Sequence, residues 1–580
     1  MPRHGIPAPK RLFGCALTDQ AEVMLSIASA DRWSDPMPTT ATTFEEFRQR
    51  VDYSLLQALK PDPEATSDGN DHRPRPVFSG HWVPVRPTPI PEPKYVAHSF
   101  ILFAELGISD DLAHNSDFTR LFSGDASVAA EPMHSWGWAT GYALSIYGTE
   151  YIQQCPFGTG NGYGDGRAMS IVEGVFEGQR WEMQLKGGGP TPYCRGADGR
   201  AVLRSSVREF LAQEFMHALG VPTSRSLTLY RSEAETVRRP WYSDHSRSFD
   251  PDVMVDNQAA ISTRVAPSFL RVGQIELFAR RARDNAHPNA HDELRLIVQH
   301  LIDRNYRAEI DATLPFHQQV LELARLFRGR LTALVANWMR VGYCQGNFNS
   351  DNCAAGGYTL DYGPFGFCEL FDPRFQPWTG GGAHFSFFNQ PAAAEANYRM
   401  FWRSLRTLLE GDDTAQRELD QLNEGFAVAM QQQLEAMWAS KLALPAYDET
   451  LVTELLQLLV AAKADYTKAF RLLSAIPDHV AELHPSFYLP SSEDLDQRWQ
   501  TWLQRWRERI TANGDLEETS AAMRRVNPAI TWREWLIAPA YQQAEQGDNS
   551  LVLELQTLFS SPYSAPSTEL AARYDQLRPQ

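Results

Sequence analysis

Three oxygen-bearing side chains lie close together in the sequence: Asp351, Asn352 and Asp361. Asp361 ends a strand-like run, 358–360, and is followed by Tyr-Gly-Pro. Mg²⁺ and Mn²⁺ prefer hard oxygen ligands, and Mg²⁺ usually takes only about one or two carboxylates, leaving phosphates and water to complete its octahedron. Asn352 and Asp361 could be such ligands, and Asp351 could then orient or deprotonate a hydroxyl. The alternative is an acidic turn capped by asparagine, but the place of Asp361 after a strand favours a metal site.

A cation suited to phosphate stands upstream, at Lys186. Residues 180–186 alternate between apolar and polar side chains, which predicts a strand that ends with Lys186 on its polar face. Three glycines follow, and a backbone that must stay uncrowded favours a nearby ligand. An exposed lysine at a sheet edge is the alternative.

An acid that could hold this lysine, Glu209, lies on the helix predicted to follow. That helix carries an apolar stripe from Val207 to Leu219 and should end at Gly220. Ser206-Val-Arg-Glu209 is also a capping box, in which the glutamate would bond to the Ser206 amide. The local sequence leaves both roles open.

Glycines and arginines suited to phosphate lie on both sides of the lysine. The glycine-rich segment 158–166 is followed at once by Arg167. Glycine lets backbone amides approach phosphate oxygens, and a guanidinium can bind them bidentately. A flexible surface loop is equally compatible with this segment. Arg264 and Arg271 would point into one cleft if Arg264 ends a strand and Pro267 begins a helix; two surface arginines are the alternative.

The elements that must position these residues form a sheet-rich part followed by a helical part. Besides the strand and helix above, strands are expected at 226–230 and 260–265, and helices at 294–306, 318–341, 401–409, 449–473 and 494–510. This order predicts an α+β, protein-kinase-like fold with a small sheet-rich N-lobe, a larger helical C-lobe and a helical C-terminal extension.

The same patterns give expected domain boundaries. Residues 1–80 should be a poorly ordered leader or targeting extension with one helix near 43–59. The proline-rich stretch 83–93 should be extended. The N-lobe, which would bind nucleotide, is expected at 81–265, the C-lobe with the catalytic and metal-binding segment at 266–393, and the helical C-terminal region at 394–580.

Composition narrows the classes of partner and compartment. The 580 residues include 54 Lys and Arg against 71 Asp and Glu, and the net charge of −17 argues against general binding to nucleic acid or anionic membranes. No apolar run approaches the roughly 18 to 20 residues of a membrane span. The six cysteines show no metal-binding spacing and suit thiols in a reducing compartment. A cytoplasmic location is expected, or a mitochondrial one if the organism is a eukaryote.

Taken together, the motifs resemble the selenoprotein O (SelO) family along residues 82–565. The matching strings are Gly-Asp-Gly-Arg at 164–167, Gln-Leu-Lys-Gly at 184–187, Thr-Pro-Tyr at 191–193, the run 197–211, the run 263–271, Asn-Ser-Asp-Asn at 349–352, Leu-Asp-Tyr-Gly-Pro-Phe-Gly-Phe at 360–367, and shorter strings at 389–391, 526–528 and 544–548.

The resemblance implies a protein-kinase-like fold that binds ATP in a flipped orientation. AMP, rather than phosphate, would pass to Ser, Thr or Tyr hydroxyls of proteins, with pyrophosphate released. Asp351 would be the catalytic base, Asn352 and Asp361 the Mg²⁺ ligands, and Lys186, held by Glu209, a phosphate ligand. The residues implied to contact ATP are Gly164, Gly166, Arg167, Lys186, Asp198, Gly199, Arg264, Arg271 and Asp361.

The chain departs from the family pattern at several places. Gln345 stands where a histidine is usual, and Pro377 where a cysteine is common. The glycine loop 147–162 differs from the usual Gly-His-Gln-Phe-Gly, and the chain ends without the C-terminal cysteine or selenocysteine motif, so control by a disulfide is not expected. Two other interpretations stay open: a conventional protein kinase, since the same residue types serve γ-phosphoryl transfer, and a catalytically inactive nucleotide-binding scaffold.

Overall fold

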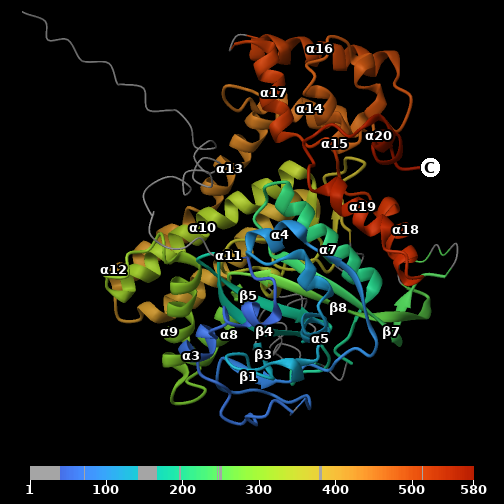
Figure 1. The fold of residues 1–580 in the computed structure, drawn as a ribbon. Helices are drawn as coiled ribbons and strands as arrows, with labels where there is room; N and C mark the ends of the chain where they lie inside the picture. Colours follow the sequence, from blue (N-terminus) through green and yellow to red (C-terminus); the bar gives the residue numbers. More distant parts are fainter. Residues whose placement is uncertain are drawn as a thin grey trace, which may run out of the picture. The chain divides into compact units, whose positions relative to one another are not determined.

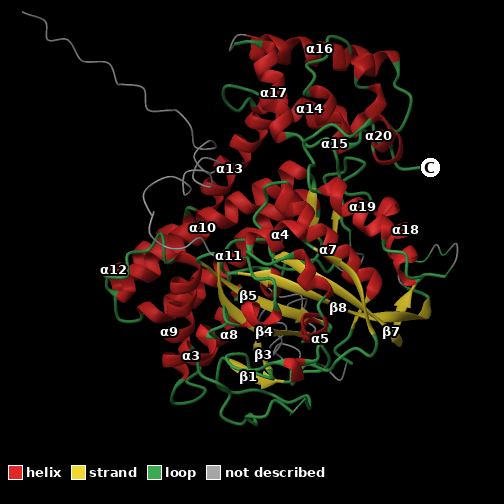
Figure 2. Cartoon of the chain, in the orientation of Figure 1, coloured by secondary structure: helices red, strands yellow, loops and turns green. Residues whose placement is uncertain are grey.

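The computed structural model describes residues 40–70, 72–140, 166–194, 198–243, 246, 248, 251–377, 382–511 and 514–579. From Ala41 onward they belong to a single unit. Figure 1 traces the chain in sequence colours, and Figure 2 separates helices from strands. The mixture of an antiparallel sheet with many helices confirms the α+β class.

An eight-stranded sheet carries Lys186 and Arg264. Its strands follow the order β1-β3-β4-β5-β8-β7-β2, β6 pairs with β8, and every pairing is antiparallel. Lys186 lies opposite Ser262, and Gln184 lies opposite Arg264. The strands are β1 (Trp82–Val85), β2 (Pro93–His98), β3 (Gly137–Thr140), β4 (Ala168–Phe176), β5 (Gln179–Lys186), β6 (Ala201–Val202), β7 (Arg225–Trp241) and β8 (Val253–Ala266). The strand predicted at 180–186 is confirmed, and the two predicted at 226–230 and 260–265 are parts of the longer β7 and β8.

The helices are many and fall mostly after the sheet. The described chain up to residue 301 contains α2 (Phe44–Arg48), α3 (Ser54–Ala58), α4 (Phe100–Glu105), α5 (Ser116–Phe122), α7 (Leu203–Ala218), α8 (Val272–Arg283) and α9 (Ala290–Leu301). The described chain after residue 301 contains α10 (Phe316–Val341), α11 (Gln390–Arg406), α12 (Asp413–Glu424), α13 (Phe426–Lys441), α14 (Glu449–Ala461), α15 (Tyr466–Leu473), α16 (Glu493–Thr511), α17 (Leu516–Val526), α18 (Glu534–Glu545), α19 (Ser550–Phe559) and α20 (Thr568–Tyr574). A hairpin of β9 (Tyr343–Gln345) and β10 (Phe365–Phe367) interrupts them. None of the described helices is both long enough and apolar enough to span a bilayer.

Helix α7 links the sheet to the end of the chain. One side packs on β7 and β8, and another meets α18 and α19. The Phe215 ring lies 4.5 Å from that of Phe559, and Arg208 Nε lies 2.8 Å from a carboxylate oxygen of Glu534. The helix ends as predicted, because Gly220 has a φ of +73°, which suits the residue after a helix terminus.

Two predicted helices are broken in the structure. Helices α14 and α15 replace the single helix expected at 449–473, because Lys463 has a left-handed φ of +48° and Ala464 bridges to Phe487. Helices α2 and α3 replace the one expected near 43–59, because the chain between them pairs Val51 with Gly174 on β4. The remaining predicted helices correspond to α9 with the π-turn η4 (Ile302–Tyr306), α10, α11 with the 3₁₀ turn η9 (Thr407–Leu409), and α16.

Residues 41–80 differ from the poorly ordered leader that the sequence suggested. Phe47, Val51 and Leu55 are buried in the same apolar core as the sheet. Arg180 on β5 forms an ion pair with Asp52. The unit boundary therefore falls between Thr40 and Ala41 rather than near residue 80.

Candidate active site

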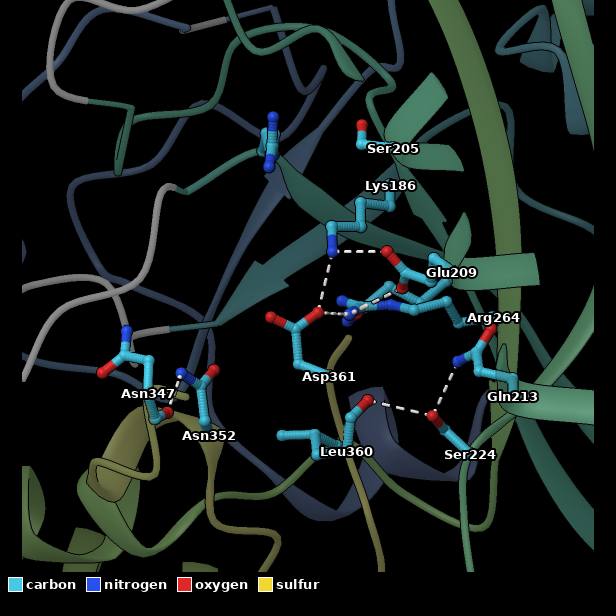
Figure 3. A network of polar contacts seen from close by, with 12 residues as sticks. Lys186, Ser205, Glu209, Gln213, Ser224, Arg264, Asn347, Asn352, Leu360 and Asp361 are labelled. Carbon is cyan, nitrogen blue, oxygen red and sulfur yellow. Dashed lines mark hydrogen bonds and ion pairs between the residues drawn. The ribbon is translucent and has the colours of Figure 1, made fainter. Parts of the chain in front are cut away.

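Lys186 and Glu209 form a buried ion pair at the end of β5. Lys186 Nζ donates to Glu209 Oε2 at 2.5 Å and to Asp361 Oδ1 at 2.8 Å (Figure 3). The Lys186 side chain is 9% exposed. Buried charges persist in proteins when they are paired and hydrogen-bonded. Lys186 is therefore not the exposed edge lysine of the alternative interpretation.

The role of Glu209 is decided by where α7 begins. β6 leads straight into α7, which starts at Leu203 with Val202 as its N-cap. Ser206 therefore lies inside the helix, and its buried hydroxyl has no hydrogen-bond partner among the described residues. Because Ser206 is not a cap, no capping box forms, and the Glu209 carboxylate turns to Lys186.

Arg264 joins this cluster from β8. Its Nη1 donates to Asp361 Oδ1 at 2.7 Å and lies 3.5 Å from Glu209 Oε1. Its Nη2 donates to Gln184 Oε1 at 2.5 Å, and only 2% of its side chain is exposed. Sequence reasoning did not single out Gln184, although the period of two places it on the same face of β5 as Lys186.

Asp361 receives both cations on a single oxygen. Its other oxygen, Oδ2, makes no hydrogen bond within the described part of the chain, and the side chain is 21% exposed. Burial raises the pKa of Asp361, but the positive charges of Lys186 and Arg264 outweigh burial and hold that pKa well below its usual range. Asp361 is thus a carboxylate with one oxygen anchored and one available.

The segment before Asp361 is less regular than predicted. The run 358–360 is no strand; Thr359 alone makes isolated bridges to Thr223 and Cys353. These bridges still join it to the chain before β7 and to the chain after Asn352. The backbone two residues before Asp361 is therefore held by contacts with two other segments, although no strand forms there.

The geometry predicted for the two arginines is partly wrong. β8 continues beyond Arg264, and the helix begins at Val272 rather than at Pro267, with Arg271 as its N-cap. Both arginines are buried, so neither is a surface residue. Arg271 also lies close enough to Asp361 to lower the pKa of that carboxyl.

Asp351 and Asn352 lie on a short 3₁₀ turn, η5 (Ser350–Asn352), that Asn349 caps. Asn349 Oδ1 accepts from the backbone N–H of Asp351 at 3.1 Å and of Asn352 at 3.2 Å. Asn352 Nδ2 donates to the Asn347 carbonyl at 2.8 Å, and Figure 3 shows this pair across from the Asp361 carboxylate. The turn is therefore capped by an asparagine, Asn349, as in the alternative interpretation. Asn352 uses its amide nitrogen in the bond to Asn347, so its side-chain oxygen remains available as a metal ligand.

The Asp351 carboxylate packs against the start of α8. The residue is 1% exposed, and a Cβ added to Gly273 would lie 2.7 Å from Asp351 Oδ1. A general base needs the acceptor hydroxyl within hydrogen-bond reach, and such contacts often form only in the substrate complex. Both oxygens of Asp351 are buried in this conformation, so an acceptor can reach them only after a local rearrangement.

Three glycine-containing segments meet beside Lys186. Gly187 N donates to the Arg167 carbonyl at 3.1 Å, and Gly189 N donates to the Gly199 carbonyl at 3.2 Å. Gly199 has a φ of +70°, and a Cβ there would lie 2.1 Å from the Gly189 backbone. Gly166 is equally confined, with a φ of +68°. The structure thus brings together Gly166, Arg167 and Gly199 as predicted neighbours, whereas Gly164 lies outside the described residues.

Asp198 is held by a residue that sequence reasoning missed. Arg239 on β7 donates to both of its carboxylate oxygens, at 2.6 Å and 2.9 Å. The Arg200 amide also donates to Asp198, at 2.9 Å. Arg239 extends from the long β7–β8 hairpin, far along the chain, so no local pattern could have revealed the contact.

The donors present fit a divalent cation that is completed by other ligands. Among the described residues, no cluster of three or more His, Cys, Asp or Glu side chains could hold a metal alone. Asp361 Oδ2 and Asn352 Oδ1 remain as hard oxygen donors, a carboxylate and an amide. Mg²⁺ is commonly bound through one or two carboxylates together with substrate phosphates and water. The protein supplies only part of such a coordination shell.

Comparison with known proteins identifies the family. The family model described as protein adenylyltransferase SelO matches residues 75–560. The chain belongs to the SelO family. A SelO-family relative from Methylobacillus flagellatus, named protein nucleotidyltransferase YdiU, is 34% identical over 91% of this chain and 96% of its own length. Proteins of the same name from Xanthomonas axonopodis pv. citri and Azoarcus sp. are 35% and 34% identical, and the matches cover 89% and 91% of this chain and 93% and 96% of theirs.

Membership in the SelO family confirms the resemblance inferred from the motifs, and with it the enzyme class, nucleotidyltransferase. At one departure from the family pattern, Gln345 is buried and accepts a hydrogen bond from the Tyr343 hydroxyl. Cys344, Cys353 and Cys368 are buried thiols without disulfides. Burial raises the pKa of the Cys368 thiol to about 12, which disfavours the reactive thiolate.

Proposed function

We propose that this SelO-family chain transfers AMP from ATP to Ser, Thr or Tyr hydroxyls of proteins and releases pyrophosphate. The family model is named for protein adenylylation, and the curated relatives are named protein nucleotidyltransferases. The proposed architecture is protein-kinase-like, with an N-lobe around the eight-stranded sheet and a C-lobe that carries the 349–361 segment. The proposed partners are ATP and hydroxyl-bearing proteins.

The buried position of Arg264 is the observation that carries the proposal. Arg264 lies on β8, beside Lys186 and against Gln184. A purine base bound at this place would need an apolar surface around it. A charged, hydrogen-bonding inner wall suits phosphate groups instead. This favours ATP bound with its β- and γ-phosphates inward, so that the α-phosphorus faces the acceptor.

The residues then have distinct proposed roles. Lys186, Arg264 and Arg271 bind the β- and γ-phosphates, with Gly166, Arg167, Asp198 and Gly199 shaping the adjoining loops. Asn352 and Asp361 would hold Mg²⁺ or Mn²⁺, which would neutralise phosphate charge when bound. Glu209 orients Lys186.

The proposed reaction balances as a single displacement. The acceptor oxygen bonds to the α-phosphorus, its proton passes to an Asp351 carboxylate oxygen, and the bond from the α-phosphorus to the bridging oxygen breaks. Charge develops on the departing pyrophosphate, where Lys186 and Arg264 stabilise it.

The cytoplasm is the proposed compartment, because Cys344, Cys353 and Cys368 are thiols.

Parallel incubation with α-³²P- and γ-³²P-labelled ATP tests the proposal. Label should remain on protein only from the α position. Asp351→Asn should lower this labelling by at least about 100-fold, the usual contribution of general base catalysis. Label retained only from the γ position would identify a protein kinase, and labelling equal to that of Asp351→Asn would identify an inactive scaffold.

A further inference from the structure

The side chains of Asp351 and Ser350 pack against the start of helix α8 at Gly273. Asp351 Oδ1 lies 2.7 Å, and Ser350 Oγ 2.9 Å, from the point where a Cβ on Gly273 would stand. Gly273 is the second residue of α8 and has an ordinary negative φ. Glycine is therefore needed here for space rather than for backbone conformation.

The start of α8 is also joined to the base-carrying loop by its backbone. Val272 N donates to the Cys353 carbonyl at 2.9 Å, and Ala355 N donates to the Leu270 carbonyl at 2.9 Å. Arg271 forms a bridge with Ala354 between these two bonds. Backbone contacts thus join the helix start to the chain after Asn352 at three successive residues, Leu270, Arg271 and Val272.

An acidic side chain lies beside the start of α8, where the N-cap residue makes no side-chain capping bond. The N-cap residue of α8 is Arg271. The first turn of a helix exposes unpaired N–H groups and carries a partial positive charge, so a carboxylate there is stabilised. Asp351 places a carboxylate beside this turn from another segment of the chain.

We infer that Gly273 is a positioning residue: its missing side chain leaves room for the Asp351 carboxylate beside the α8 N-terminus, the position from which that carboxylate moves to receive the acceptor proton. The inference rests on the proposed function for its catalytic consequence, but the steric contact does not. A methyl group at 273 would push the carboxylate away without touching the phosphate-binding cluster on β5 and β8.

The test compares Gly273→Ala with Gly329→Ala, a change in α10 where an added Cβ meets nothing within 4 Å. AMP transfer and ATP binding are measured separately, by α-label incorporation and by calorimetry with Mg²⁺–ATP. Gly273→Ala should lower kcat at least tenfold and change the Kd for ATP less than twofold. Gly329→Ala should leave both unchanged.

A second measurement needs no activity. Alanine favours helices over glycine, so Gly329→Ala should raise the melting temperature slightly. Gly273→Ala should lower it in the wild-type background and lower it less in the Asp351→Ala background, where the nearest obstructing atom is gone and Ser350 Oγ remains. Equal shifts in both backgrounds, or an unchanged kcat, would overturn the inference. A wild-type chain without AMP transfer would refute the proposed function alone, since the melting shifts would still decide the steric contact.

Discussion

Replacing Lys186 with methionine is the most informative single change at the site, because it keeps the apolar stem and removes the charge. Glu209 and Asp361 would then still both contact Arg264. Breaking a buried pair by removing one partner costs about 3–5 kcal/mol. Since Arg264 still contacts both carboxylates, we expect the lower end, about 3 kcal/mol, in the free energy of unfolding.

The effect on ATP follows from the same geometry. Loss of one charge-assisted hydrogen bond to phosphate costs about 1.5–3 kcal/mol, which is roughly 10- to 150-fold in Kd. Calorimetric titration of folded protein with Mg²⁺–ATP measures it, after circular dichroism has shown that Lys186→Met is folded at the assay temperature.

Glu182→Gln is the matched control on the same strand. Glu182 is buried on the same face of β5 as Lys186, and it accepts a hydrogen bond from Ser170 rather than from the cationic cluster. Its substitution should change the Kd for ATP less than twofold. Equal losses of affinity in the two variants would refute the assignment of Lys186 to the phosphates.

Three further outcomes are expected. Burial raises the pKa of Glu182 from 4.5 to about 7, so between these pH values the folded chain keeps a proton that the unfolded chain has lost, and the free energy of unfolding falls as pH rises. In urea titrations at pH 5 and 7.5, Glu182→Gln should reduce this fall in the free energy of unfolding by up to about 3 kcal/mol. Gly199→Ala should weaken ATP binding at least tenfold in calorimetry, because its added Cβ would meet the Gly189 backbone. Gly178→Ala is the control, since Gly178 also has a positive φ but no atom lies near its added Cβ. Similar losses of ATP affinity in the two variants would contradict a role for the Gly199 loop in binding ATP. Asn349→Ala removes the cap from two amides and should lower the free energy of unfolding by about 1 kcal/mol in denaturant titrations and lower kcat with it; a change in KM for ATP alone would contradict this.

The sequence predicted the strongly periodic elements and the residues of the cluster, but not how they meet. The alternation at 180–186 identified β5, and the apolar stripe after it identified α7. The start of α7 was missed because β6 runs into the helix, so the Ser206 capping signal was overridden by a strand–helix junction. Such junctions depend on pairing with β8, which lies far along the chain.

Contacts between distant segments account for the remaining differences. Gln184 and Arg264 meet only because β5 and β8 are neighbours in the sheet. Asp198 meets Arg239, and Asp351 meets Gly273, through pairings that a local window cannot contain. Residue types could thus be assigned to chemistry from the sequence, whereas their supporting partners required the three-dimensional arrangement.

Because α7 packs between the sheet and helices α18 and α19, the end of the chain supports the helix that carries Glu209. Phe215 touches Phe559, and Arg208, which precedes Glu209, is tied to Glu534. A shortened protein that stops before α18 would expose an apolar flank on the helix that aims Glu209 at Lys186. Anyone trimming this enzyme to a minimal catalytic core should therefore cut after α19.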